Sequence, residues 1–284
     1  MRFAHEEMLT NCDVCGGGGL HTVDLEARVM VCGDCGFRFV NPRPTQEAIA
    51  ASYSNPHAYD HWLREEEGRE KMWRKRLQLV ERLSGGRRGR LLDVGAGIGT
   101  FLALARDKGW EVAGTEVSSS AISLARERHG LELREAQLEQ SGLATGSFEL
   151  ITLWHVLEHV PSPAGTLREV HRVLAPGGMV VVAVPNDSNA MLVPRRLKRF
   201  LTRKAFRRYE PVMPGEEVHL SHFHPAVLRR LLTRTGFTPG RVTIDDQYPL
   251  PNRWTTGRVA AGRALVWLTR LNLGNSLLVF GRRP

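Results

Sequence analysis

The sequence predicts an α/β protein in which a small metal-binding ribbon precedes a seven-stranded, Rossmann-like sheet. Three observations predict this organisation. Short apolar runs alternate with helix-like segments from residue 90 onward, as in sheets whose parallel strands are joined by helices. The first of these runs ends in three glycines at alternate positions, which indicates a ligand-binding turn. All four cysteines lie in two close pairs near the N-terminus, which indicates a zinc-stabilised unit.

The composition indicates an ample apolar core and a basic C-terminal third. Hydrophobic residues make up 42% of the 284 residues. No apolar run reaches the length of a membrane span and residues 1–7 form no apolar signal region, so we expect a soluble, cytoplasmic protein. The net charge is +9, but residues 186–284 hold 18 basic and 6 acidic residues, which leaves −3 for the rest. This distribution favours an anionic partner near the C-terminal third.

The cysteines predict a closed zinc site. Two Cys-x-x-Cys pairs, separated by sixteen residues, contain Cys12, Cys15, Cys32 and Cys35. Four thiolates suit tetrahedral Zn²⁺ and leave no open position, so the expected role of the metal is structural. The alternative of two disulfides is disfavoured because no secretion signal precedes the pairs. We expect the ribbon to occupy residues 1–44.

A helical connector is expected over residues 45–86. Thr45 is a candidate N-cap, and apolar residues at helical spacing run from Met72 to Leu83 before Gly85 and Gly86 end the pattern. The main domain is therefore expected over residues 87–284.

The apolar run Leu91–Val94 leads into the glycine turn, and a helix follows from Phe101. A dinucleotide site would need its third glycine where Thr100 stands, and Asp93 would repel a pyrophosphate. A carboxylate beside a glycine turn suits a ligand that has a cationic end and no phosphate. S-adenosylmethionine (SAM) has this chemistry.

The remaining strands bring polar groups to the same edge of the sheet. Residues 110–117 predict a strand that ends at Glu116, where an acid can accept hydrogen bonds from ribose hydroxyls. Short strands are expected at 131–133 and 147–153, and the second of these delivers Trp154 and His155. Later segments predict strands at 179–184, 241–247 and 276–280, with helices from Pro163, through Val227–Leu232 and over 259–271.

The ordered set of Asp-x-Gly-x-Gly-x-Gly at 93–99, Glu116, Leu-Glu-His-Val at 157–160 and Leu-x-Pro-Gly-Gly at 174–178 resembles class I SAM-dependent methyltransferases. The resemblance is to the group of ubiquinone-type O-methyltransferases and sugar or natural-product O-methylases. It implies the seven-stranded methyltransferase sheet and methyl transfer to a hydroxyl of a small acceptor. The residues expected at the cofactor are Asp93, Gly95, Ala96, Gly97, Gly99, Glu116, Val117, Gln137 and Trp154.

Four histidines are candidates for catalysis: His155, His159, His219 and His222. A sugar or phenol hydroxyl is a poor nucleophile, and histidine is suited to take its proton near neutral pH. In the resembled ubiquinone-type enzymes a Glu-x-x-Glu-His pattern can hold a divalent metal. Here His155 replaces the first Glu, and Glu158-His159 remain, which makes the metal-assisted route the less favoured one.

A basic amphipathic segment at about 190–225, with eight Arg and Lys between Arg195 and Arg208, is expected to be helical. It suits a lid over an acidic acceptor, a peripheral membrane contact or a solvated surface. The ribbon and the basic charge also suggest an RNA methyltransferase. Against nucleic acid as the partner, Trp154–Leu157 stand where base N-methylases carry Asn/Asp-Pro-Pro-aromatic. A non-catalytic SAM-binding regulator is the third alternative, and the sequence predicts no oligomeric state.

Overall fold

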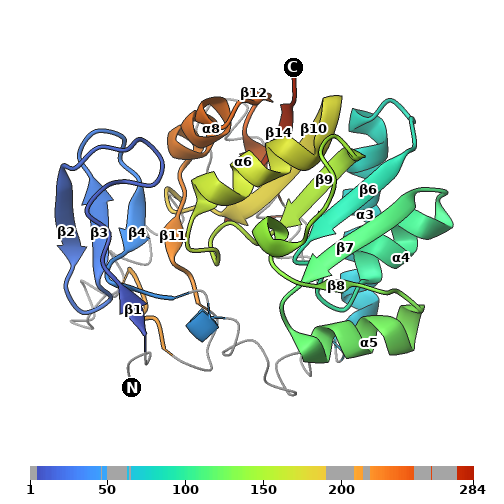
Figure 1. Cartoon of the computed structure of the whole chain (residues 1–284), viewed down its shortest axis with the longest axis horizontal. Helices are drawn as coiled ribbons and strands as arrows, with labels where there is room; N and C mark the ends of the chain where they lie inside the picture. The colour runs from blue at the N-terminus through green and yellow to red at the C-terminus, as the bar shows by residue number, and fades with distance from the viewer. Residues whose placement is uncertain are drawn as a thin grey trace.

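The computed structural model describes residues 5–45, 47–49, 63, 65–189, 208–213, 218–245, 257 and 274–284. Two sheets lie side by side, the ribbon at one end of the molecule and the large sheet with its helices at the other (Figure 1). Within the described residues, no helix has the length and apolar character needed to cross a membrane.

The large sheet confirms the predicted methyltransferase topology. Its strand order is β12-β14-β10-β9-β6-β7-β8, and β13 also pairs with β14. The neighbours from β10 to β8 are parallel, whereas β14 runs antiparallel to β10 over seven residue pairs. The strands are β6 (Arg90–Val94), β7 (Glu111–Glu116), β8 (Arg134–Glu135), β9 (Phe148–Trp154), β10 (Leu174–Pro185), β12 (Thr238–Pro239), β13 (Thr243–Ile244) and β14 (Ser276–Arg282).

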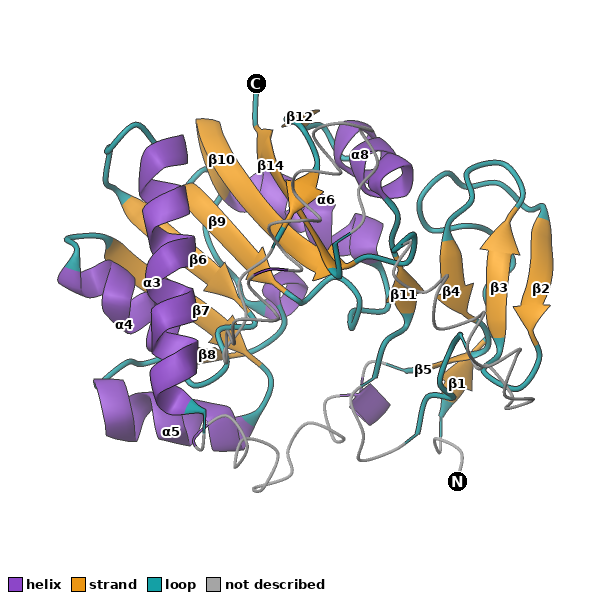
Figure 2. Ribbon diagram, turned by 180° about the vertical axis from the view of Figure 1, so that it is seen from behind, coloured by secondary structure: helices purple, strands orange, loops and turns teal. Residues whose placement is uncertain are grey.

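Helices cover both faces of this sheet. Helices α3 (Glu66–Leu83) and α4 (Thr100–Asp107) pack on the face seen in Figure 2, and α6 (Pro163–Val173) and α8 (Pro225–Arg234) on the face seen in Figure 1. Side chains of β10 alternate between the two cores: Val181 packs with α3 and α4, and Val182 with α6 and α8. Helix α5 (Ser119–His129) and the short helix η1 (Leu138–Gln140) follow β7 and β8.

The ribbon takes one strand from the C-terminal part of the chain. Its sheet has the order β11-β4-β3-β2, built from β2 (Leu20–Asp24), β3 (Val29–Cys32), β4 (Arg38–Val40) and β11 (Ser221–His222). A second small pair joins β1 (Glu6–Glu7) to β5 (Arg43–Pro44). The buried Phe37 and Phe39 belong to the same apolar core as residues of α6 and α8, so the ribbon is fused to the main domain.

The structure differs from the expected elements in two places. The third strand of the main domain is Arg134–Glu135, because Leu131 and Leu133 are buried core residues just before it. In the basic segment, residues 208–213 and 218–222 are not helical, and Ser221 and His222 pair with β4 instead. Residues 190–207 and 214–217 of that segment, and the helix expected at 259–271, lie outside the described residues.

Candidate active site

A cavity of about 890 Å³ opens where β6, β7 and β9 end. Its walls come from the glycine turn, the end of β7, the residues around η1, the segment after β9 and the buried face of α3. Ligands of such sheets bind beyond the carboxyl ends of the strands, and this cavity has that position.

The glycine turn requires glycine for two physical reasons. Gly95, Gly97 and Gly99 have φ of 67°, 55° and 77°, in the left-handed region that other residues rarely adopt. A Cβ on Gly95 would also lie 2.8 Å from Val156 Cγ2. The amides of Gly95 and Ala96 donate to Thr115 O, which fixes the turn against the end of β7.

Glu116 organises the turn from the neighbouring strand. Its Oε2 accepts from the Gly97 amide at 2.8 Å, and its Oε1 accepts from the amides of Val117 and Ser118 at 2.8 and 2.9 Å. Burial raises the pKa of Glu116, and these three amides oppose that effect. A carboxylate has about four lone-pair positions, so Glu116 keeps acceptor capacity toward the cavity that it lines.

Asp93 lies beneath the turn. Its side chain is buried, and its Oδ1 accepts a hydrogen bond from Thr152 Oγ1 at 2.5 Å. Burial raises the pKa of Asp93 to about 7, with the charge of Glu116 adding to the effect. Of the residues expected at the cofactor, six line the cavity: Gly95, Gly97, Glu116, Val117, Gln137 and Trp154. Asp93, Ala96 and Gly99 are not among its lining residues.

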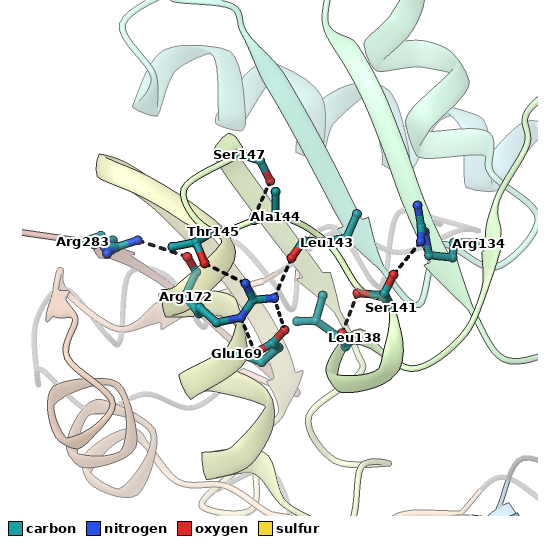
Figure 3. A network of polar contacts seen from close by, with 10 residues as sticks. All are labelled: Arg134, Leu138, Ser141, Leu143, Ala144, Thr145, Ser147, Glu169, Arg172 and Arg283. Atoms are coloured by element: carbon teal, nitrogen blue, oxygen red, sulfur yellow. Dashed lines mark hydrogen bonds and ion pairs between the residues drawn. The ribbon is translucent and has the colours of Figure 1, made fainter.

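The cavity wall around η1 is braced from behind. Arg134 donates to Ser141 O, and Ser141 Oγ donates to Leu138 O (Figure 3). Arg172, near the end of α6, binds Glu169 and also donates to Leu143 O. These contacts fix the segment that carries Gln137 relative to α6.

The wall formed by α3 contains a buried cation that sequence reasoning missed. The guanidinium of Arg76 lies 4.7 Å from the ring centroid of Trp73 and 4.8 Å from that of Trp154, and it forms an ion pair with Asp245. One signal was available: Arg76 falls among Met72, Trp73, Leu77 and Val80, the apolar face of its helix. Nothing in the sequence pointed to Asp245.

His155 and Glu158 form a pair just after the C-terminal end of β9. His155 lines the cavity and has a φ of 58°, unusual for a residue with a side chain. Its Nδ1 lies 3.1 Å from Glu158 Oε1, and its Nε2 lies 4.0 Å from Asp245 Oδ2. Burial alone would raise the pKa of Glu158, but the hydrogen bond from His155 and the nearby His159 and His219 lower it. An ionised Glu158 only accepts, so His155 carries its proton on Nδ1.

His159 and His219 meet on the other side of Glu158. His159 Nδ1 lies 2.7 Å from Val218 O, and because a carbonyl only accepts, Nδ1 carries the proton of neutral His159 and Nε2 carries the lone pair. His159 Nε2 lies 3.8 Å from Glu158 Oε1. The rings of His159 and His219 meet edge to face at 4.9 Å. His159 lines the cavity, and His219 is not among its lining residues.

These side chains also form a candidate cation site. One ligand atom each from Glu158, His159 and His219 lies within 4.8 Å of the others. Glu158 Oε2 is buried and meets no hydrogen-bond partner among the described residues. One carboxylate and two imidazoles fit a divalent transition-metal ion. His155, in place of the first Glu of the metal-binding pattern, binds Glu158 and is not part of this cluster.

His222 is placed away from the other three candidates. It lies on β11, where its ring contacts that of Tyr209 at 4.6 Å. Burial lowers the pKa of His222 to about 4. It does not line the cavity.

The four cysteines converge as their spacing predicts. Cys12 Sγ lies 3.5 Å from Cys35 Sγ, and Cys15 Sγ lies 3.5 Å from Cys32 Sγ. A tetrahedral site with Zn–S bonds of about 2.3 Å has S···S edges of about 3.8 Å, whereas a disulfide needs about 2.0 Å. Burial raises the pKa of Cys35 to about 11, so a cation is needed to hold its thiolate. The donor set fits Zn²⁺.

Comparison with known proteins identifies the family. Residues 59–240 match the family model described as a methyltransferase domain. The chain belongs to this methyltransferase family. This methyltransferase is also similar to ubiquinone biosynthesis O-methyltransferases. It is 28% identical to that of Aeromonas salmonicida over 192 residues, which cover 64% of this chain and 77% of the relative.

Other relatives match over a shorter stretch. The ubiquinone biosynthesis O-methyltransferase of Alkalilimnicola ehrlichii is 35% identical over 119 residues, which cover 39% of this chain and 48% of the relative. Among solved structures, a SAM-dependent methyltransferase from Thermotoga maritima, a possible histamine N-methyltransferase, gives a TM-score of 0.56 at 16% identity and covers 83% of this chain and 100% of that chain. Magnesium protoporphyrin IX methyltransferase from Synechocystis with bound S-adenosylhomocysteine gives 0.55 at 14% identity, covering 84% and 100%. The structural neighbours show the shared fold.

Proposed function

We propose that this SAM-dependent methyltransferase transfers a methyl group to a hydroxyl of a small acceptor, an anionic or nucleotide- or lipid-linked sugar or natural product. The observation that carries the proposal is the position of His155 and His159 on the wall of the cavity that also contains the glycine turn and Glu116. The candidate proton acceptors, His155 and His159, and the candidate cofactor site therefore line the same cavity.

Each residue has a defined part in this proposal. Glu116 binds the ribose hydroxyls, and the glycine turn admits the cofactor to the backbone. The bound cofactor supplies an electrophilic methyl group for in-line displacement, which depends on positioning. His159 Nε2, whose ring is oriented by Val218 O, takes the proton of the acceptor hydroxyl; His219 is the alternative base. His155, held by Glu158, lines the acceptor side.

A divalent cation on Glu158, His159 and His219 would supply a second way of acidifying the hydroxyl. In that case His159 would be a ligand, and His155 would be the remaining imidazole on the cavity wall. Both arrangements use the same four side chains.

The charges of the cavity wall support a polyhydroxylated acceptor. Glu7, Glu47 and Glu139 line it, and carboxylates accept hydrogen bonds from hydroxyl groups. The described cations of the wall, Arg69 and Arg76, are paired with Glu65 and Asp245. The expectation that the arginine-rich segment 195–207 binds an anionic portion of the acceptor concerns residues outside those that the structure describes.

The test is methyl uptake from labelled SAM into a panel of hydroxylated nucleotide sugars, lipid-linked glycans, phenols and RNA. We expect uptake into one hydroxylated small-molecule class, with the label on oxygen. Uptake into RNA alone, lost steeply with added salt, would support the nucleic-acid alternative. SAM binding without uptake into any substrate would support the non-catalytic alternative.

A further inference from the structure

The segment after β9, residues 155–162, joins the candidate catalytic histidines to α6, and the zinc ribbon contacts its far end through Asp13. Asp13 lies between the zinc ligands Cys12 and Cys15. Its Oδ1 accepts from Ser162 Oγ at 2.7 Å, and its Oδ2 accepts from the Ala164 amide at 2.8 Å. Ser162 Oγ in turn accepts from the Gly165 amide at 3.0 Å. The start of α6 is therefore capped by a residue of the ribbon as well as by its own N-cap.

The start of α6 is also part of the cavity. Ser162, Gly165 and Thr166 line it, and Thr166 Oγ1 donates to Glu139 Oε1 at 2.5 Å across the wall. A shift at Ser162 would therefore move both the wall and the segment that carries His159.

Two further contacts tie the same segment to the ribbon. Arg43, on β5, donates to Pro161 O and pairs with Glu7. The amide of Val40 donates to Leu220 O, and the amide of Leu220 donates to Glu158 O at 2.7 Å. The ribbon and the strand β11 that it includes therefore fix residues 155–162 at Glu158, in the middle, and at Pro161 and Ser162, at the end.

We propose that Asp13 is a positioning residue for methyl transfer: by capping α6 from within the first zinc knuckle, it holds residues 155–162 in their catalytic place. The inference rests on the proposed function. It assigns the ribbon a role inside the active site of the same chain, and it makes the geometry of the cysteine site a determinant of turnover. Among the described residues, the Asp13 carboxylate binds Ser162 and Ala164 and no residue of the glycine turn, so we do not expect Asp13 to affect SAM binding.

The experiment compares Asp13→Asn and Asp13→Ala with Asp34→Asn in the zinc-loaded full chain. Asp34 is a matched control because it lies in the other knuckle, between Cys32 and Cys35, and is exposed. Its carboxylate forms no hydrogen bond or ion pair with residues 155–166, all of which the structure describes. Zinc content, thermal unfolding, SAM affinity by calorimetry and hydrogen exchange of the peptide 162–167 are measured for each. Turnover is measured with the acceptor that the methyl-uptake panel identifies.

We expect both Asp13 variants to retain one zinc and to bind SAM within about twofold of wild type. The reason is that the Asp13 side chain is a ligand of neither the zinc nor SAM in this proposal. Exchange of peptide 162–167 should accelerate by about tenfold, because the Ala164 amide loses a charge-assisted partner. The kcat should fall by about tenfold with the KM for SAM unchanged. Asp34→Asn should behave like wild type.

Three results would overturn the proposal: unchanged exchange in both Asp13 variants, unchanged kcat despite faster exchange, or the same losses in Asp34→Asn. Loss of zinc from both Asp13 variants would also overturn it, because the effect would then belong to the folding of the ribbon. If wild type transfers no methyl group to the panel, the proposed function fails, and the exchange data still decide whether Asp13 holds α6.

Discussion

Arg76 on α3 and Asp245 after β13 form an ion pair although 169 residues separate them, and their side chains are only 4% and 3% exposed. The pair lies between the rings of Trp73 and Trp154 and the imidazole of His155. It therefore connects the connector helix, the C-terminal part of the sheet and the cavity wall.

The first prediction concerns this pair. Removing one partner leaves the other charge buried, so Asp245→Asn should lower the free energy of unfolding by about 3–5 kcal/mol in urea titration. The double variant Arg76→Met/Asp245→Leu should recover part of that loss. Glu132→Gln breaks the exposed pair with Arg126 and should leave the free energy of unfolding close to that of wild type, because solvent screens that pair. Equal losses in Asp245→Asn and Glu132→Gln would contradict the burial argument.

The second prediction is one Zn²⁺ per chain on the four cysteines. Metal analysis of protein purified without chelator should give near-stoichiometric zinc, and Cys12→Ser should reduce it. Because the ribbon shares its apolar core with α6 and α8, zinc removal should also lower the melting temperature of the whole chain. A folded, reduced sample without zinc would be inconsistent with the site.

The third prediction concerns the cofactor. Glu116→Ala should weaken SAM binding by about 2–3 kcal/mol, or about 30- to 150-fold, because a charged acceptor for the ribose is lost. Glu116→Gln keeps the shape of the side chain and separates this effect from collapse of the turn at Gly97. Calorimetry that finds wild-type affinity in a folded Glu116→Ala protein would remove Glu116 from the site.

The fourth prediction is a pH dependence of stability from Asp93. Its pKa rises from 3.8 in the unfolded chain to about 7 in the folded protein, so the folded state binds the extra proton between these values. The stabilising contribution is complete below pH 3.8 and is lost as the pH rises through 7, by at most about 4 kcal/mol. Asp93→Asn should remove this loss. Parallel pH profiles of unfolding free energy for the two proteins would disprove the shift.

The fifth prediction separates the histidines. His159→Ala or His219→Ala should lower turnover by at least about tenfold while SAM affinity stays the same. His222→Ala is the matched control, because His222 lies outside the cavity and should leave turnover near wild type. If a cation assists, chelation should lower turnover, and a divalent transition-metal ion such as Mn²⁺ should restore it. Chelation that leaves turnover unchanged points to the histidine base alone. Wild-type turnover in all three variants would exclude proton transfer by these residues.

Local patterns allowed much of the fold to be predicted. The glycine turn, Glu116 and the cysteine pairs depend on residues close in sequence or on one strand end. Alternation of apolar runs with helices predicts a parallel sheet, and the resemblance to methyltransferases implies its overall form. The confirmed elements include α8, for which apolar spacing was sufficient, and β14.

The contacts that shape the site were beyond such patterns. Arg76 and Asp245 are distant in sequence, and β11 has two residues, too few for any periodicity. His219 and His222 are both histidines and stand three positions apart. Because His222 lies on β11, its ring contacts the ring of Tyr209. In the sequence, Asp13 is only a residue between two predicted zinc ligands, and its hydrogen bond to the Ala164 amide depends on how α6 packs.

The pairing of β11 with β4 also sets an order of assembly. Ser221 pairs with Phe39, so the ribbon sheet is complete only after about 180 intervening residues have been synthesised. Closing so long a loop costs entropy that local contacts do not repay, which makes this a late step. The cysteines, all within the first 35 residues, can capture their metal long before that moment. During synthesis the metal site can therefore form first, and β11, the strand that joins it to the catalytic domain, pairs with β4 later.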